Sequence, residues 1–262
     1  MRDLNGEGFC ATLDVLGEFI ATHEEAELAV QVYLDALDRI DKESLDSNVS
    51  VKLTMLGLKL DEEFCYQNIR KLVHRAKELD NFVRIDMEDS TCTTPTLAIF
   101  GRLREEFDNV GFVVQSYMRR SVADIREQIQ KNGHINVRVC KGIYIESRDI
   151  AYKDDFVINS NFMWLVEELL SKQHYVGIAT HDPRLVWSAY KMIDHLQVDK
   201  TKFEFQMLLG VDEQLRKSIL DAGYKLRVYV PYGKRWYDYS IRRLKENPKI
   251  AGHVIKRFFK VT

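Results

Sequence analysis

Eight short apolar runs, each followed by a longer amphipathic segment, set the tightest limit on how this chain folds. The runs are rich in β-branched and aromatic residues. Several stay apolar at successive positions, as strands of a parallel sheet do when both faces are covered. The runs lie at residues 8–14, 49–54, 82–87, 110–115, 135–141, 175–180, 203–208 and 225–230. We expect one β-strand in each run.

The segments between the runs carry helix-start signals. Residues 22–25 form a capping-box pattern in front of a helix expected over 25–40. Thr94-Pro95 has the pattern of an N-cap followed by proline at the first helical position, and Asp182-Pro183 gives the same signal. Further helices are expected at 61–79, 121–131, 161–172, 212–223 and 236–246.

Strict alternation of eight strands and eight helices predicts an α/β fold, a (β/α)8 barrel of the TIM type. The alternative is a doubly wound open sheet. Eight units in 262 residues favour the barrel, and no GxGxxG follows the first strand. Because no linker or low-complexity tract interrupts the pattern, we predict one domain over residues 1–262.

Composition narrows the classes of partner and the compartment. The formal net charge of −2 gives no reason to expect attraction to nucleic acid or to an anionic membrane. No apolar run approaches the roughly 18–20 residues of a membrane span, and the first residues lack the apolar region of a signal peptide. The four cysteines are widely spaced, which predicts reduced thiols rather than a zinc site or a disulfide framework. We therefore expect a cytoplasmic protein, with peripheral membrane contact left open.

Polar residues interrupt the apolar runs near the ends of the predicted strands, where a barrel carries its active site. They are Asp14, Lys52, Asp86, Gln115, Arg138, Lys141, Thr180, His181, Glu204, Gln206, Arg227 and Tyr229. One interpretation is that some of them satisfy one another as buried ion pairs or face the helices. Burying so many charges without a function is costly, so the whole ring favours a site. The cations Lys52, Arg138 and Lys141 favour an anionic ligand.

Arg242 and Arg243 are adjacent in the last predicted helix, where neighbouring side chains point about 100° apart. If that helix lies across the barrel mouth, both guanidinium groups can reach one ligand, and arginine binds carboxylates in a bidentate manner. Otherwise the pair belongs to a solvent-exposed face. Aromatic residues nearby favour the first interpretation because they can form an apolar wall beside the charges. They are Tyr229, Tyr232, Trp236, Tyr237 and Tyr239.

Other chemistries are less well supported by the residues. Asp86 with His181 is too small a set for a metal site. Lys52 or Lys141 can form a Schiff base with a carbonyl substrate, as in barrel aldolases. No Ser or Cys triad stands out. Composition and spacing therefore define a barrel enzyme for a small anionic substrate, without its reaction.

The block at 227–244, RVYVPYGKRWYDYSIRRL, closely resembles the signature of proline dehydrogenase in its monofunctional bacterial form. Six further blocks agree with that family, in the family's order. They are SVKLT at 50–54, FVRIDMED at 82–89, VVQSY at 113–117, VRVCKG at 137–142, ATHD at 179–182 and FEFQML at 203–208. The resemblance spans essentially the whole chain, and seven blocks in register are highly specific.

The resemblance implies a distorted (β/α)8 barrel whose last helix lies over the mouth. It also implies an enzyme that oxidises L-proline to Δ1-pyrroline-5-carboxylate, reduces FAD and passes electrons to a membrane quinone. The positions that match proline-binding residues are Lys52, Leu208, Tyr229, Arg242, Arg243 and Glu246. The two arginines match the pair that grips the carboxylate, with Lys52 as a further partner. Tyr229 and Leu208 match residues around the proline ring, and Glu246 matches one that helps hold the last helix closed.

The resemblance assigns catalytic roles to Asp86 and Arg138. Asp86 matches an acid near Lys52 and the ring amine, and Arg138 matches a residue near the flavin N5. The positions that match the FAD lining are Met87, Gln115, Arg138, Lys141, Gly142, Ile143, Thr180 and His181. A cation there stabilises a reduced, anionic flavin. No metal is implied, and no dedicated base for the amine proton is obvious.

Three features depart from the family pattern. The first strand is expected near residue 8, whereas the family usually begins several tens of residues earlier, with helices. Ile143 stands where the family has a small alanine, and residues 247–250 replace a motif that ends in Ala-Asn.

Two other functions stay open beside proline oxidation. One is a class I aldolase-like barrel that uses Lys52 or Lys141, and the other is a non-catalytic flavin-binding barrel.

Overall fold

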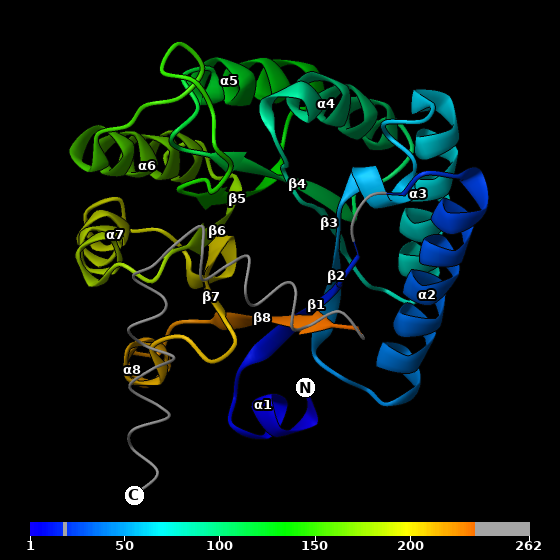
Figure 1. Ribbon diagram of the computed structural model, residues 1–262. Helices are drawn as coiled ribbons and strands as arrows, with labels where there is room; N and C mark the ends of the chain where they lie inside the picture. The colour runs from blue at the N-terminus through cyan, green and yellow to red at the C-terminus, as the bar shows by residue number, and fades with distance from the viewer. Residues whose placement is uncertain (18–19, 234–262) are drawn as a thin grey trace, which may run out of the picture.

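The structure is a computed structural model that describes residues 1–17 and 20–233. Eight parallel strands in this part close into a barrel in which each strand pairs with the next and β8 pairs with β1 (Figure 1). The strands are β1 (Cys10–Val15), β2 (Ser47–Val51), β3 (Val83–Ile85), β4 (Val110–Gln115), β5 (Asn136–Cys140), β6 (Tyr175–Ala179), β7 (Phe203–Leu208) and β8 (Leu226–Tyr232). The predicted barrel is confirmed, and the open sheet is excluded.

Helices surround the barrel and connect successive strands (Figure 1). They are α2 (His23–Lys42), α3 (Glu62–Glu78), α4 (Ser90–Arg104), α5 (Ser121–Asn132), α6 (Asp155–Leu170), α7 (Pro183–His195) and α8 (Glu213–Asp221). A short α1 (Arg2–Gly6) precedes β1, and the 3-10 turns are η1 (Leu53–Leu56) and η2 (Lys200–Lys202). The helix expected over 236–246, with its place over the mouth, lies outside the described residues. The assignment of residues 1–262 to one domain stays a prediction.

Two helices begin five or six residues earlier than the sequence predicts. Helix α4 begins at Ser90, so that Pro95 lies inside it instead of at its first position. Asp89 is its N-cap, and the Ser90 N–H donates to the carboxylate of Glu146 at 2.7 Å. Helix α6 begins six residues before the predicted start because Asp154 accepts two of its first N–H groups. A local sequence pattern cannot predict a helix start that depends on a distant residue such as Glu146.

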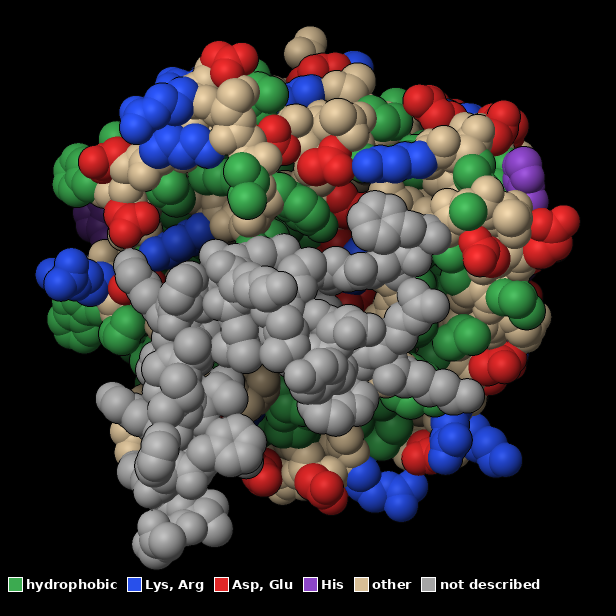
Figure 2. Space-filling view, viewed as in Figure 1, with side chains coloured by type: hydrophobic (Ala, Val, Ile, Leu, Met, Phe, Trp, Pro, Cys, Tyr) green, Lys and Arg blue, Asp and Glu red, His purple; other side chains and the backbone are tan. Residues whose placement is uncertain are grey.

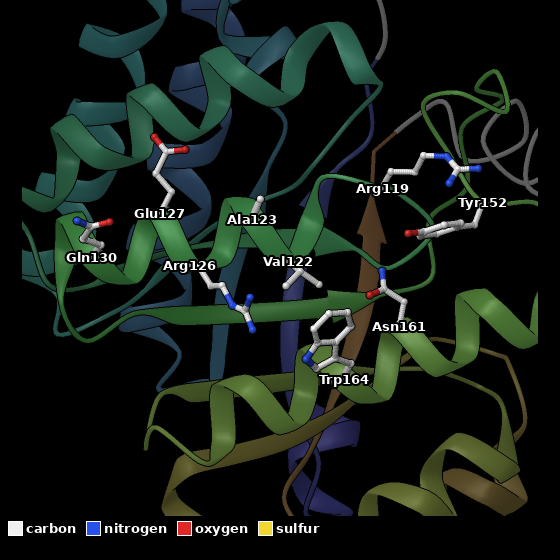
Figure 3. A pocket seen from close by; sticks show the side chains of 9 residues that line it. All are labelled: Arg119, Val122, Ala123, Arg126, Glu127, Gln130, Tyr152, Asn161 and Trp164. Carbon is white, nitrogen blue, oxygen red and sulfur yellow. The ribbon is translucent and has the colours of Figure 1, made fainter.

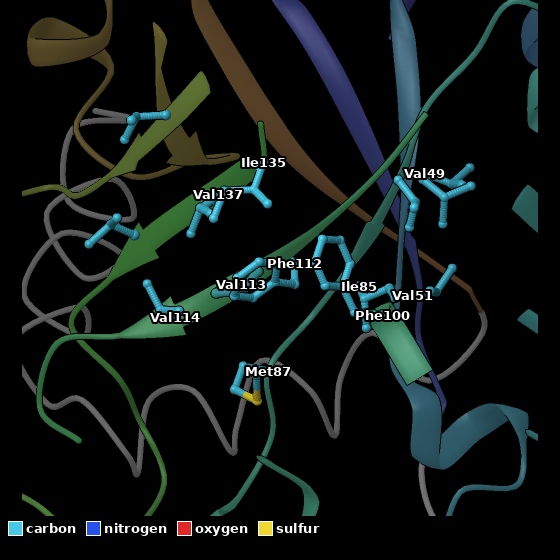
Figure 4. Packing of buried hydrophobic residues seen from close by; sticks show 14 of the residues in the cluster. Val49, Val51, Ile85, Met87, Phe100, Phe112, Val113, Val114, Ile135 and Val137 are labelled. Carbon is cyan, nitrogen blue, oxygen red and sulfur yellow. The ribbon is translucent and has the colours of Figure 1, made fainter. Parts of the chain in front are cut away.

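The hydrophobic core lies between the barrel wall and the helices (Figure 4). Val49, Ile85 and Val137 from three strands are fully buried there. Phe100 of α4 packs on Phe112 of β4 with ring centroids 4.5 Å apart. Burying a side chain of this kind contributes roughly 1.5–3 kcal/mol, so this layer is the main source of the barrel's stability.

The inside of the barrel, in contrast, holds polar side chains. In β5, Val137 and Val139 belong to the hydrophobic core, whereas Arg138 between them bonds across the barrel to Asp86. This is the period-2 alternation of a strand, with one set outward and the other inward. Strands β7 and β8 show the same alternation. The inward polar residues on β5, β7 and β8 are Arg138, Glu204, Gln206, Arg227 and Tyr229.

Candidate active site

Asp86 is the centre of a hydrogen-bonded cluster at the carboxyl ends of the strands. It follows β3, and its side chain is 12% exposed. Its Oδ1 accepts from Ser50 Oγ at 2.7 Å and from Arg138 Nη1 at 2.6 Å. Its Oδ2 accepts from Tyr229 Oη at 2.9 Å. One carboxylate therefore joins β2, β3, β5 and β8.

Lys52 brings a second positive charge to the cluster. Its Nζ lies 2.5 Å from Asp14 Oδ1 and 4.0 Å from Asp86 Oδ2. Lys52 is the residue before the turn η1, and Glu88 holds that turn by accepting from Thr54 N at 3.1 Å and Thr54 Oγ1 at 2.6 Å. The ammonium group is thereby fixed at the end of β2 next to two carboxylates.

The two carboxylates differ in their proton affinity. Burial raises the pKa of Asp86, but Arg138 and Lys52 outweigh burial, and the net pKa is lower than usual. Burial dominates at Asp14 and raises its pKa despite the contact with Lys52. At neutral pH Asp86 is ionised. It therefore acts as an acceptor and a charge rather than as a proton donor.

The Arg138 side chain is held on its other side by β7. Its Nε donates to Gln206 Oε1, and Gln206 Nε2 donates to Glu204 Oε1 at 2.7 Å. Arg227 Nε donates to the same oxygen of Glu204 at 2.8 Å. Sequence reasoning found Glu204, Gln206 and Arg227 as polar strand residues but gave them no role.

The segment after β5 carries Lys141, Gly142 and Ile143. Lys141 Nζ lies 2.9 Å from Asp182 Oδ2, which joins the ends of β5 and β6. Gly142 has a φ of +107°, and a Cβ at this position would clash with the ring of Tyr117. Glycine is therefore required here, both for the backbone conformation and for space.

The remaining residues expected to line FAD also lie at strand ends. Gln115, the last residue of β4, donates its Nε2 to the carbonyl of Glu88 at 2.8 Å. Thr180 Oγ1 accepts from the Asp182 N–H at 3.1 Å. His181 Nε2 accepts from the N–H of Leu208 at 3.3 Å, and Met87 is buried in the hydrophobic core.

The structure thus brings most of the sequence-predicted site residues to one end of the barrel. Arg242, Arg243 and Glu246 lie outside the described residues. Sequence reasoning gave no role to Ser50, which bonds both Asp86 and Arg138. A small polar residue within the apolar run of β2 was the available signal.

A separate groove lies on the outside of the barrel between α5 and α6 (Figure 3). Its cations are already engaged, since Arg126 pairs with Glu168 and Arg119 lies over the ring of Tyr152. On the face shown in Figure 2, acidic and basic side chains are mixed around the edge, and no large region there carries charges of only one sign. The cluster around Asp86 is therefore the stronger candidate for a functional site.

A (β/α)8 barrel with buried, paired charges at the carboxyl ends of its strands has the architecture of a barrel enzyme for a small polar substrate. Comparison with known proteins defines the family. The family model described as "Proline dehydrogenase" matches residues 1–256. The chain belongs to the proline dehydrogenase family.

Individual relatives agree with this family match. "Proline dehydrogenase 1" of Bacillus subtilis (strain 168) is 36% identical over 260 residues, which cover 99% of this chain and 85% of the relative. "Proline dehydrogenase" of Deinococcus radiodurans is 34% identical over 265 residues, 99% of this chain and 85% of the relative. The crystal structure of proline utilization A from Bdellovibrio bacteriovorus, inactivated by N-propargylglycine, aligns with a TM-score of 0.87 at 26% identity. That alignment covers 94% of this chain but only 31% of that longer protein.

Proposed function

We propose that this protein oxidises L-proline to Δ1-pyrroline-5-carboxylate, with FAD as the hydride acceptor and a membrane quinone as the next electron acceptor. The observation that carries the proposal is the buried cluster of Asp86, Lys52, Arg138 and Tyr229 in a chain of the proline dehydrogenase family. Proline is small and carries a carboxylate, which suits a compact site containing two cations.

The side chains at the ends of β4, β5 and β6 fit FAD by the chemistry of their donors. Gln115 supplies an amide, Lys141 an ammonium group and Thr180 a hydroxyl group. Arg138 uses Nε and Nη1 within the cluster, and no described residue takes a hydrogen bond from its Nη2. Such donors suit phosphate oxygens and the electron-rich edge of a reduced flavin. The proposed FAD site comprises Met87, Gln115, Arg138, Lys141, Gly142, Ile143, Thr180 and His181.

The residues around Asp86 orient the substrate in this proposal. Lys52, held at 2.5 Å by Asp14, binds the proline carboxylate. Leu208 and Tyr229 form walls around the ring. Asp86 fixes Arg138 and Tyr229 in direction through hydrogen bonds to each. FAD, when bound, supplies the acceptor for the hydride, and a ring held close to it reacts faster because its orientation is already set.

Three further residues of the proposed substrate site lie beyond residue 233. Arg242 and Arg243 grip the proline carboxylate together with Lys52, since guanidinium groups bind carboxylates in a bidentate manner. Glu246 matches a family residue that helps to hold the arginine-bearing helix closed. Their roles rest on the resemblance to the family at 227–244.

The contacts of the two lysines disfavour the aldolase-like alternative. Lys52 lies 2.5 Å from Asp14, and Lys141 lies 2.9 Å from Asp182. Each amine is thus held by a carboxylate, whereas a Schiff base needs an amine that is placed to attack a carbonyl carbon. The geometry therefore supports substrate binding by charge rather than covalent catalysis by lysine.

Electron transfer to a quinone requires contact with a membrane. None of the helices within residues 1–17 and 20–233 is long and apolar enough to span a bilayer. We propose that the quinone step occurs at a peripheral contact with the cytoplasmic side of the membrane. Stimulation of proline oxidation by vesicles that contain a quinone, relative to vesicles without it, tests this step.

An anaerobic titration of the flavin-loaded protein with L-proline tests the proposed oxidation. We expect proline to bleach the flavin absorption band. Lys52→Met should need at least about tenfold more proline for half bleaching, because a hydrogen bond to a charged group contributes about 1.5–3 kcal/mol. Lys59→Met is the matched control, since Lys59 is exposed and pairs with Asp89. A folded, flavin-loaded protein that proline does not bleach would contradict the proposal and would leave a non-catalytic flavin-binding barrel.

A further inference from the structure

Arg138 is held at two of its three guanidinium nitrogens by residues of β2 and β7 and by Asp86, which follows β3. Its side chain is 7% exposed. Nη1 donates to Asp86 Oδ1 at 2.6 Å and to Ser50 Oγ at 3.3 Å, and Nε donates to Gln206 Oε1. Among the described residues, none accepts from Nη2. The planar guanidinium group is thus fixed through Nε and Nη1, and within the described residues Nη2 keeps its donors for a ligand.

The amide of Gln206 has only one orientation that satisfies its neighbours. Its Oε1 faces the donor Arg138 Nε, and its Nε2 donates to Glu204 Oε1 at 2.7 Å. A flipped amide would place Nε2 against Arg138 Nε, donor against donor, and Oε1 against a carboxylate oxygen, acceptor against acceptor. The neighbours on both sides therefore lock this amide.

Glu204 can orient the Gln206 amide because its carboxylate stays ionised. Burial raises its pKa, but Arg227 at 2.8 Å outweighs burial, and the net pKa falls from 4.5 to about 2. An ionised carboxylate only accepts hydrogen bonds, so it sets the direction of the Gln206 amide. Arg227 is fixed in turn, since its Nη1 donates to the carbonyl of Ala11 at 2.5 Å. The contacts run from β1 and β8 through β7 to β5.

Gly177 on β6 makes room for this arrangement. It lies beside Arg138 on one neighbouring strand and beside Glu204 on the other. A Cβ at Gly177 would lie 2.6 Å from Gln206 Nε2 and 3.0 Å from Gln206 Cδ. Any other residue at position 177 would push the amide away from its two partners.

We propose that Gln206, oriented by Glu204 and given space by Gly177, is a positioning residue that aims Arg138 Nη2 at the flavin. The inference rests on the proposed function, because it assigns Nη2 to the FAD side of the site. Gln206 itself touches neither substrate nor cofactor in this scheme. It acts through Arg138, whose charge stabilises the reduced flavin only if the guanidinium group keeps its direction.

The substitution Gln206→Leu removes the acceptor while keeping a similar volume. We expect kcat for proline oxidation to fall about 10- to 100-fold, less than the roughly 100- to 1000-fold cost of losing a preorganised donor, because Arg138 is misdirected but still present. The proline KM should change less than about threefold. The flavin midpoint potential should shift to a more negative value, because Arg138 then stabilises the reduced form less. For a two-electron couple, a tenfold change in the equilibrium between reduced and oxidised flavin corresponds to about 30 mV.

Gly177→Ala tests the same link without changing Gln206. We expect it to lower kcat and the midpoint potential in the same direction as Gln206→Leu. Gly101→Ala is its matched control, since a Cβ at Gly101 meets nothing within 4 Å. Asn136→Ala controls for loss of an amide beside a buried arginine, because Asn136 Oδ1 accepts from Arg84 instead of Arg138. Both controls should leave kcat and the potential at their original values, even if the melting temperature of Asn136→Ala falls.

A direct readout in the flavin-loaded protein is solvent exchange of the Arg138 Nε–H proton, followed by NMR and assigned by its loss in Arg138→Lys. We expect exchange at least about tenfold faster in Gln206→Leu and in Gly177→Ala. Unchanged exchange and potential in both variants would overturn the inference. So would an equal fall of kcat in Asn136→Ala. If the flavin-loaded protein fails to oxidise proline, the proposed function fails, while the exchange rates and potentials still decide the role of Gln206.

Discussion

A single buried carboxylate, Asp86, determines the geometry of the candidate site. It accepts hydrogen bonds from Ser50, Arg138 and Tyr229 and lies 4.0 Å from Lys52. These partners come from three strands, so the carboxylate also joins the barrel wall across its interior. The same residue therefore stabilises the barrel and orients the side chains of the candidate site.

Removal of this charge should destabilise the fold. Asp86→Asn leaves Arg138 buried without its counter-charge, and breaking a buried pair in this way costs about 3–5 kcal/mol. Glu106→Gln is a matched control, because Glu106 also accepts from an arginine, Arg70, at 2.6 Å, but in an exposed pair. Solvent screens that pair, so Glu106→Gln should lose much less unfolding free energy than Asp86→Asn. Unfolding of both variants in urea measures the difference. Equal losses of unfolding free energy would show that Asp86 contributes no more to stability than the exposed Glu106.

Sequence reasoning identified the charged residues of the site but not what holds them. Lys52, Asp86 and Arg138 stand out because charges are rare in apolar runs. Ser50 and Gly177 do not stand out, since small residues are common in strands. Their importance comes from partners 88 and 29 positions away in the chain, Arg138 and Gln206. Only the closed barrel brings such positions together.

At the scale of elements, the strands were easier to predict than the helix starts. The runs at 110–115 and 203–208 coincide with β4 and β7. Strands buried on both faces are marked by their own composition, whereas a helix start depends on which group accepts its first N–H groups. Glu146 accepts from the first residue of α4 across 56 positions, and the local Thr94-Pro95 signal was misleading for that reason.

The loop between β5 and α6 depends on Gly142. The substitution Gly142→Ala forces a side chain into a φ of +107° and against the ring of Tyr117. We expect a loss of stability of roughly 1–3 kcal/mol and weaker FAD binding, because Lys141 and Ile143 are displaced with it. Gly133→Ala shares the positive φ, at +64°, but a Cβ there meets nothing within 4 Å. Calorimetric titration of both variants with FAD separates the clash from the backbone strain. Equal FAD affinity in the two variants would contradict the assignment of Gly142 to the proposed FAD site.

The molecule as a whole separates its apolar and polar layers by the alternation of its strands. Outward positions pack against the helices, while inward positions hold charges that pair across the barrel. The eight-unit pattern was enough to predict this closed barrel. The sequence did not reveal which inward charges pair, because pairing depends on the stagger of the strands in the closed barrel.

Buried titratable groups also determine how stability responds to acid. His174 is 5% exposed, and its Nδ1 accepts from the Ile135 N–H at 3.4 Å, which requires an unprotonated nitrogen. Burial, with smaller contributions from His134 and Lys172, lowers the pKa of His174 from 6.5 to about 4. The folded state therefore binds fewer protons than the unfolded state between these values. Stability from this group is complete above pH 6.5 and is lost as the pH falls toward 4.

His174→Gln keeps an acceptor at this position but does not titrate. From pH 7 to pH 5 we expect the wild type to lose about 1–2 kcal/mol more unfolding free energy than the variant. Glu204, whose pKa falls from 4.5 to about 2, adds its own loss only below pH 4.5 and does so in both proteins. Urea unfolding at a series of pH values measures the difference, and the values above pH 7.5 supply the constant offset due to packing. Parallel stability curves between pH 7 and pH 5 would show that His174 titrates alike in the folded and unfolded chain.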